Sequence, residues 1–503
     1  MSLSYEIWGL AGVQGPTFLY FFKKDLTNAV RYAAFLLTAV SKKAFVIRGV
    51  LRTTELQGGL LMSNQMLVLK EKLNAAINQI CATSREFVKD PLRDFTRLRQ
   101  LPMQRVLKIL LCAEGGTLTA ELLKFFHFHQ DTPTDSAFIQ QLHKLNDAAL
   151  PALFHTFVNM TDLAHRYKGY RLLAADGSDI QIPLNPQDSS SYFPSANNKA
   201  PYNMLHLDAL YDLRQRTYVD ASVCGRRNLN EKAALAKMIE RSAITDALVI
   251  ADRGYEGYNL MAHIQEKGWK FLIRIKDINS SGMASGLPLP SSEEFDVFFP
   301  LHLTKQRKAE ARELLKDTAH YKLLAPNATF DFLPTTSRKT DPVCWYALPF
   351  RVVRFQISDS TYETVVTNLD AGDFPPQELK RLYAMRWGIE TSFRELKYTV
   401  GLLHFHAKKV EYIIQELFAR IIMYNFSELI TSLIVTQNYS RKYAYKANFS
   451  VAVQMCRQFF LGIVSPPDVE ANIAKNLSPI RPGRCFPRNL GGRHMISFTY
   501  RIA

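Results

Sequence analysis

Four side chains that can bind metal or phosphate recur at helical spacing in the segment LYAMRWGIETSFRELKYTV. Tyr383, Arg386, Glu390 and Lys397 follow the pattern Y-x2-R-x3-E-x6-K. On a helix that turns about 100° per residue, these four positions fall within about 60° of one another. The pattern therefore predicts one carboxylate inside a row of cations along one side of a helix, which suits a metal ion that faces phosphate.

The same predicted helix has a second, apolar side. Trp387 and Arg394 extend the functional row, whereas a separate stripe packs the helix against the protein: Leu382, Met385, Ile389, Phe393, Leu396 and Val400. The helix is expected to be entered through Pro375 and Pro376, because proline suits the first turn of a helix. Trp387 has two open interpretations, stacking on a base or packing beneath the site.

Two aspartates stand beside predicted strands in the segment before this helix. Asp176 lies in AADGSDI, at a predicted break in the first strand, and Asp252 directly follows the predicted buried strand Ala247–Ala251. Ligands bind in the crevice at the carboxyl ends of sheet strands, so both carboxylates are expected to point into such a crevice. Gly177 and Gly254 permit tight turns beside them, so that a metal or phosphate can approach the backbone.

Together with Glu390, these aspartates can hold two divalent cations. Mg²⁺ takes few protein oxygens, and water and substrate phosphate complete its octahedron. Two such ions, about 3.5–4 Å apart, activate an attacking oxygen and stabilise the leaving oxygen of an in-line displacement at phosphorus. The residues therefore predict phosphoryl transfer by Asp176, Asp252 and Glu390.

Each of these residues also has an ordinary interpretation. An aspartate after a strand is usually a turn or cap residue, and a glutamate on an arginine-rich helix is usually a salt-bridge partner. Asp179 rivals Asp176 as a metal ligand but ranks below it, because Asp176 lies beside the predicted strand break. His404 and His406 form an H-x-H without a nearby third ligand, so a loop or phosphate contact is preferred to a metal pair.

Patterning divides the chain into helical and mixed segments. Apolar spacing predicts helices over 95–111, 118–126 and 137–150, with a helix-turn-helix as a weak DNA-reading element. From Tyr170 the predicted order is strand, strand, strand, helix, strand, helix, strand, which implies a mixed sheet flanked by helices. The expected domains are an uncertain extension (1–61), a helical DNA-binding domain (62–165), the first part of a catalytic core (166–275), a β-rich insertion (276–375), the motif helix of the core (376–410) and a helical region with a basic tail (411–503).

Composition favours a polyanionic partner in a reducing compartment. Lysine and arginine outnumber acids by 62 to 46 among 503 residues, a net charge of +16, which is typical of nucleic-acid binders, with a solvated basic surface as the alternative. None of the six cysteines forms a C-x-x-C pair. No apolar run reaches the ~18 residues of a membrane span, and the N-terminus lacks a positive secretory start, so we expect a cytoplasmic protein. A separate hypothesis concerns residues 1–61: the translated protein starts at Met62.

The chain resembles the IS4 family of DDE transposases, whose ribonuclease-H-like core carries an acidic triad and a Y-R-E-K signature. The resemblance covers roughly residues 90–440, and all four signature positions are present at the family's spacing. The family's triad maps onto Asp176, Asp252 and Glu390. DRGYEGY resembles the family's motif around the second aspartate, although its later residues are less diagnostic.

The resemblance implies a fold, a reaction and partners. The implied fold is α/β (mixed α+β): a ribonuclease-H-like catalytic core with a β-rich insertion, an N-terminal helical domain and a C-terminal helical region. The implied activity is cut-and-paste DNA transposition by the triad with Mg²⁺, for which Mn²⁺ can substitute, on bacterial nucleoid DNA. The candidate DNA contacts are Tyr383, Arg386, Lys397, Arg253, Trp387 and Arg394; Arg253 either touches DNA or balances its neighbouring aspartate.

The implied partners are double-stranded DNA with terminal inverted repeats, target DNA and a second copy of the chain in a synaptic complex, with no membrane partner. Two other functions stay open at this point. One is a catalytically inactive relative that still binds DNA ends, and the other is a ribonuclease-H-like nuclease that cuts without joining.

Overall fold

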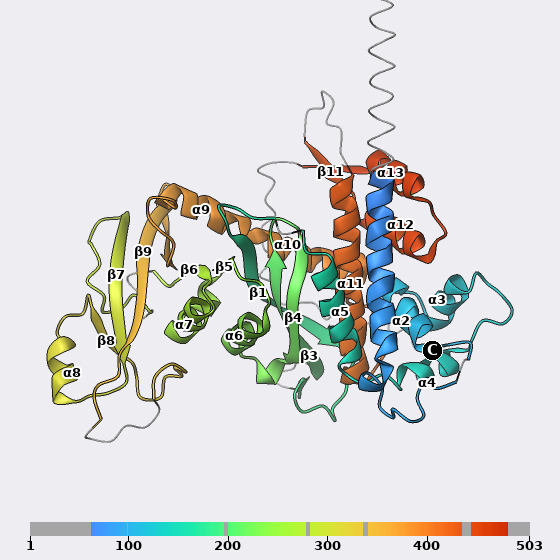
Figure 1. The fold of residues 1–503 in the computed structure, drawn as a ribbon, viewed down its shortest axis with the longest axis horizontal. Helices are drawn as coiled ribbons and strands as arrows, with labels where there is room; N and C mark the ends of the chain where they lie inside the picture. The colour runs from blue at the N-terminus through green and yellow to red at the C-terminus, as the bar shows by residue number, and fades with distance from the viewer. Residues whose placement is uncertain are drawn as a thin grey trace, which may run out of the picture. The chain divides into compact units, whose positions relative to one another are not determined.

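The computed structural model describes residues 62–97, 99–163, 165–195, 200–277, 282–334, 341–434 and 444–480. The chain divides into two compact units, Met1–Gln65 and Met66–Ala503. Every strand and helix that carries a label in Figure 1 belongs to the second unit. The expectations for residues 1–61 and for the basic tail beyond residue 480 lie outside the described residues.

A ten-stranded mixed sheet organises this unit (Figure 1). Its strands run in the order β2-β3-β1-β5-β6-β10-β9-β7-β8, and β4 also pairs with β3. The strands are β1 (Arg171–Ile182), β2 (Tyr192–Phe193), β3 (Tyr202–Asp212), β4 (Thr217–Gly225), β5 (Ala247–Ala251), β6 (Lys270–Arg274), β7 (Phe295–Thr304), β8 (Tyr321–Leu323), β9 (Tyr346–Ser358) and β10 (Thr361–Thr367).

The strand order of the first half matches the predicted core. β1, β3 and β4 form an antiparallel meander, and β5 and β6 join the other edge of β1 in parallel. Helices α6 (Glu231–Arg241) and α7 (Tyr258–Glu266) supply the crossovers that parallel strands require. The predicted mixed α/β class is confirmed, and the strands and helices of this half follow in the predicted order.

The segment expected as a β-rich insertion continues this sheet. β10 pairs antiparallel with β6, and β9, β7 and β8 extend outward from it, with α8 (Ala309–Leu314) between β7 and β8. Val352 of β9 and Val366 of β10 are buried in the same cluster as core residues of β5. The inserted strands therefore enlarge the core sheet, and they do not form a separate one.

Alternation along the central strands gives the sheet two buried faces. Leu173 and Val249 lie in a cluster with side chains of α6 and α7. Leu172 and Ile250 lie in a second cluster with Leu382 of α9 (Pro376–Met385). Because successive strand residues point to opposite faces, the register assigns each later residue of β1 to the α6 face or to the α9 face.

Helices precede the sheet. A long helix over residues 62–82 is followed by four shorter ones: α2 (Met103–Cys112), α3 (Leu118–Phe125), α4 (Asp135–Leu142) and α5 (Ala149–Met160). The predicted helix over 95–111 is wrong in its first half, because Pro102 is extended and α2 begins directly after it. The predicted helix over 137–150 is interrupted, because Asn146 holds a turn by accepting the N–H of Ala148 and by donating to the carbonyl of Glu86.

The C-terminal region is built around α11 (Val410–Leu433), which is buried along most of its length and contacts α5, α12, α2 and β4. It is followed by β11 (Tyr445–Ala447), α12 (Phe449–Leu461), α13 (Pro466–Lys475) and β12 (Leu477–Pro479). Within the described ranges, no helix has both the length and the hydropathy needed to cross a bilayer.

Candidate active site

Asp176 and Asp252 occupy neighbouring positions on two parallel strands. Ala175 of β1 pairs with Ala251 at the end of β5, so the next residue on each strand is one of the two aspartates. The expected break of β1 at Asp176–Gly177 is wrong: β1 continues to Ile182 because β3 keeps pairing with it. What ends at this point is β5, and its end opens one edge of β1 beside Asp176.

Both aspartates belong to the α9 face of the sheet. Leu172, two pairs of residues before Asp176 on β1, packs in the α9 cluster, and so does Ile250, two residues before Asp252. Asp252 also caps the short helix that follows it, because its Oδ1 accepts the N–H of Gly254 at 2.7 Å. Asp252 is therefore a cap residue, as an aspartate after a strand usually is, and the strand register also places it beside Asp176.

The motif helix is divided into three segments. α9 ends at Met385, α10 spans Trp387–Glu395, and a π-helical turn, η4, spans Leu396–Val400. Arg386 joins α9 to α10 in right-handed helical conformation. The one continuous helix expected from the sequence is therefore wrong in detail, and the wider π turn shifts Lys397 from the angle that a regular helix would give it.

Arg386 connects the motif helix to β1. Its Nη2 lies 2.6 Å from Oε1 of Glu390, and its Nη1 lies 3.5 Å from Oδ2 of Asp176. Arg386 itself is buried. A single guanidinium thus bridges two of the three candidate metal ligands, and the third, Asp252, stands beside Asp176 in the sheet.

The surroundings of Asp176 disfavour its ionised form, chiefly because the group is buried. Burial raises its pKa to about 6, and the negative charges of Asp252 and Glu390 raise it further, against the lowering effects of the Gly177 N–H and Arg386. All three donor groups are carboxylates, the ligands that Mg²⁺ prefers. The residues present therefore fit a divalent cation, which would relieve the repulsion among them.

The triad is not drawn tightly together in this structure. Its three carboxylates do not all approach one another within 4.8 Å, a limit that one other group of described residues meets. The guanidinium of Arg386 lies between Asp176 and Glu390.

The candidate DNA contacts differ in their access to solvent. Trp387 is 54% exposed, and its ring lies 5.4 Å from the Arg386 guanidinium. This exposure does not agree with the interpretation that Trp387 packs beneath the site. Arg253 and Arg394 are also exposed. Tyr383 is only 5% exposed and packs with the α9 core.

Lys397 of η4 contacts Asp179 of β1. The Nζ of Lys397 donates to the backbone carbonyl of Asp179 at 2.7 Å. The Asp179 carboxylate points away from the triad, to Nδ1 of His206 at 2.7 Å and Nε of Arg226 at 2.8 Å. Burial alone would raise the pKa of Asp179, but these two partners lower it overall. Asp179, the rival ligand, therefore belongs to a different cluster.

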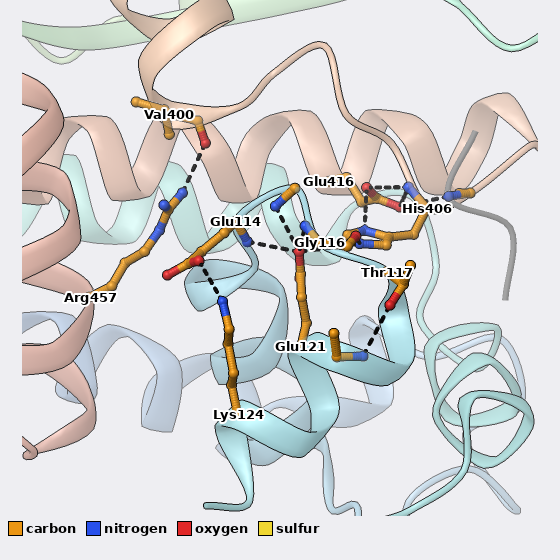
Figure 2. A network of polar contacts seen from close by, with 12 residues as sticks. Glu114, Gly116, Thr117, Glu121, Lys124, Val400, His406, Glu416 and Arg457 are labelled. Atoms are coloured by element: carbon orange, nitrogen blue, oxygen red, sulfur yellow. Dashed lines mark hydrogen bonds and ion pairs between the residues drawn. The ribbon is translucent and has the colours of Figure 1, made fainter. Parts of the chain in front are cut away.

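The H-x-H sequence is part of an ionic cluster that joins α3 to α11 (Figure 2). His406 lies 3.4 Å from Glu121 and 3.3 Å from Glu416, and its ring also contacts the carbonyl of Gly116. Burial opposes a charge on His406, yet the two glutamates raise its pKa to about 10. We call Glu121, His406 and Glu416 the glutamate clasp. His406 lies in the loop between η4 and α11, in agreement with the loop position that is preferred to a metal pair.

Glu121 illustrates what sequence patterns miss. Its Oε1 accepts the N–H groups of Glu114, Gly115 and Gly116 at 3.1, 2.7 and 2.6 Å. Burial raises its pKa, but His406 and these contacts lower it to about 2. Glu121 and its partner His406 are 285 residues apart in the chain, so spacing gives no signal of the pair.

Comparison with known proteins places these residues in context. Residues 167–426 match the family described as "Transposase DDE domain". Over 300 residues the chain is 25% identical to "Transposase InsG for insertion sequence element IS4" from Escherichia coli (strain K12). The aligned region covers 58% of this chain and 59% of that protein. The chain thus spans about three fifths of the length of this relative. The structure also aligns with a piggyBac transposase synaptic complex with hairpin DNA, at 11% identity and a TM-score of 0.40, over 85% of this chain and 87% of the other.

Proposed function

Because the chain belongs to the family of transposases with a DDE domain, in its IS4 branch, we propose that it cuts and joins the ends of an insertion element. The reaction would be strand cleavage followed by strand transfer, by phosphoryl transfer at a site formed by Asp176, Asp252 and Glu390. The observation that carries the proposal is the register of β1 and β5, which makes the two aspartates neighbours. The contact of Arg386 with both Asp176 and Glu390 adds the third acid.

The three carboxylates would hold divalent cations, Mg²⁺ or Mn²⁺. When bound, these ions would activate the attacking oxygen and stabilise the leaving oxygen. Asp176, with a pKa of about 6, is mainly ionised at neutral pH and so can serve as a ligand. Arg386 would hold the Glu390 carboxylate toward β1, and a guanidinium is also a group that suits phosphate.

Exposed groups around the triad would bind the DNA. Arg253 and Arg394 offer cations to phosphates, contacts that fix position without reading sequence. Trp387 offers an exposed ring on which an unstacked base could lie. Lys397 would act as a compact charge beside β1, and Tyr383 would support Arg386 from the core, since the guanidinium lies 5.8 Å from its ring.

The partners and the domain roles belong to the same proposal. The substrates would be double-stranded DNA with terminal inverted repeats and a target DNA, and two copies of the chain would pair two ends. Residues 62–165 would form the helical DNA-binding domain, 166–275 and 376–410 the catalytic core, 276–375 the insertion, and 411–503 the C-terminal region. The net charge of +16 supports a polyanionic substrate.

The deciding experiment uses the DNA that flanks the coding region. Short imperfect inverted repeats on both sides supply the substrate, a linear duplex that ends in a repeat. We expect Mg²⁺-dependent nicking at the repeat and joining of the freed 3′ end to a plasmid. Asp252→Asn should bind this duplex and do neither. Nicking without joining would favour a nuclease, and wild-type activity of the Asp252→Asn variant would overturn the assignment of the site.

A further inference from the structure

A second group of metal-ligating side chains lies on the α6 face of the sheet, behind the triad. His206 and Asp208 come from β3, and Glu231 is the first residue of α6. One ligand atom from each of the three lies within 4.8 Å of the others. Residues 206 and 208 pair with Asp179 and Gly177 of β1, positions whose side chains point away from the α9 face.

The histidine of this group is oriented as a metal ligand is. Nδ1 of His206 lies 2.7 Å from Oδ1 of Asp179, which Arg226 also contacts. A metal-bound histidine almost always donates its other ring N–H to such an acceptor, which fixes the tautomer. Nε2 of His206 is then directed at Oε1 of Glu231, 3.2 Å away, and at Oδ1 of Asp208, 3.5 Å away.

Two buried atoms in the group lack a hydrogen bond. His206 is 3% exposed and Asp208 is 1% exposed. His206 Nε2 and Asp208 Oδ1 are at ion-pair distance, but neither has a partner in hydrogen-bond geometry among the described residues. An unpaired nitrogen that faces an unpaired carboxylate oxygen in a buried site favours a proton or a cation between them.

Charge balance favours a divalent cation over a proton in that place. Asp179, Asp208 and Glu231 bring three negative charges, and Arg226 brings one positive charge. Among these side chains alone, a protonated His206 leaves one negative charge uncompensated, whereas a neutral His206 with a divalent cation leaves none.

We propose that His206, Asp208 and Glu231 bind one divalent transition-metal ion, Zn²⁺ or Mn²⁺, at a site separate from the triad. An imidazole with two carboxylates suits these ions better than Mg²⁺, which prefers oxygen ligands alone. Because Gly177 has no side chain, His206 and Glu231 can approach the backbone of β1 closely. A Cβ at this position would lie 2.3 Å from His206 Nε2 and 2.9 Å from Glu231 Oε1. The ion would tether α6 to β3 beside Gly177, the residue that follows Asp176 on β1.

The test separates this site from the triad and from the proposed function. The full chain with Asp252→Asn and Glu390→Gln, stripped with chelator, is dialysed against Zn²⁺ in excess Mg²⁺, and zinc is measured by elemental analysis. We expect about one zinc per chain. This outcome does not depend on any DNA reaction.

Variants in the same background define the ligands. Asp179→Asn, the partner of the ligating histidine, should lower zinc affinity by about 10–100-fold. Glu231→Gln, on the partly exposed end of α6, and His206→Gln should lower it further, and circular dichroism checks that each variant folds. His263→Gln is the matched control, because His263 forms an exposed pair with Asp331 at 2.8 Å outside this cluster; it should bind zinc normally. No zinc in the parent, or full binding by Glu231→Gln, would overturn the proposal.

Discussion

The triad and the glutamate clasp each contain a largely buried carboxylate, and the two regions differ in how well that carboxylate is paired. In the clasp, Glu121 accepts three backbone N–H groups and contacts His406, and its pKa falls to about 2. In the triad, Asp176 accepts the N–H of Gly177 and has a 3.5 Å contact to Arg386, and its pKa rises to about 6. Both carboxylates are largely buried, so burial does not explain the difference.

The difference teaches how to distinguish a structural carboxylate from a candidate ligand. A satisfied carboxylate in the clasp stabilises the fold, because its ionised form has partners in the native state. An undersatisfied group of like charges costs stability, and such strain is typical of functional sites. Matched substitutions in the two regions should therefore separate activity from stability.

The largest effect is expected from Glu390→Gln in the triad. A bound metal supplies several kcal/mol of transition-state stabilisation, so strand cleavage should fall by at least about 10³-fold. Stability should be little changed, because Glu390 is partly exposed and glutamine keeps its shape. Cleavage of an inverted-repeat duplex and the thermal unfolding midpoint are measured together. Retained cleavage would show that the Glu390 carboxylate is not needed for catalysis.

Glu121→Gln should do the opposite. Breaking a buried ion pair costs about 3 kcal/mol, so the urea midpoint should fall, whereas cleavage per folded molecule should stay near that of the wild type. An unchanged midpoint would show that Glu121 does not hold α3 to α11.

The clasp also predicts a pH dependence of stability. The folded pKa of His406, about 10, lies above its ordinary value of 6.5. Its contribution is therefore fully present below pH 6.5 and is lost as the pH rises toward 10. We expect the stability difference between wild type and His406→Gln to shrink over this range in unfolding curves. A difference that grows with pH would contradict a protonated His406.

Trp387→Ala is expected to have a moderate effect on DNA and almost none on the fold. Its ring is 54% exposed, so unfolding should shift by less than about 0.5 kcal/mol. Loss of a base stacked on it should cost about 1–3 kcal/mol in affinity for a duplex with unpaired end bases. Titration of paired and unpaired ends measures this cost, and equal losses for both would argue against stacking.

The smallest effect is expected from Lys397→Ala. Removal of one phosphate contact should lower the salt slope of DNA binding by about one unit. Lys397 also donates to the carbonyl of Asp179, so Lys397→Arg, which keeps the charge, serves as the control. An unchanged slope in the alanine variant would place Lys397 in the structural group with the clasp.

Several features of the fold could be predicted because they depend on local patterns. The buried run ALVIA predicts β5 with its observed bounds, and the alternation after Tyr170 predicts β1, β3 and β4 in order. The continuity of β1 through Gly177 could not be predicted in this way. Gly177 suggests a break locally, but pairing with β3 carries the strand through it to Ile182. The same limit applies to Pro102 and to Asn146, whose turn depends on a contact with Glu86.

The sequence by itself determined which residues can do chemistry and roughly where they stand, because side-chain type and helical or strand spacing are local properties. It placed Glu390 and Arg386 on one helix and Asp252 after a strand. Only the tertiary structure decided which of these groups meet. Register sets Asp252 beside Asp176 and sends Asp179 to the opposite face, and the packing of α9 buries Tyr383. Contacts between distant segments depend on how strands pair and helices pack, and no spacing along the chain records that.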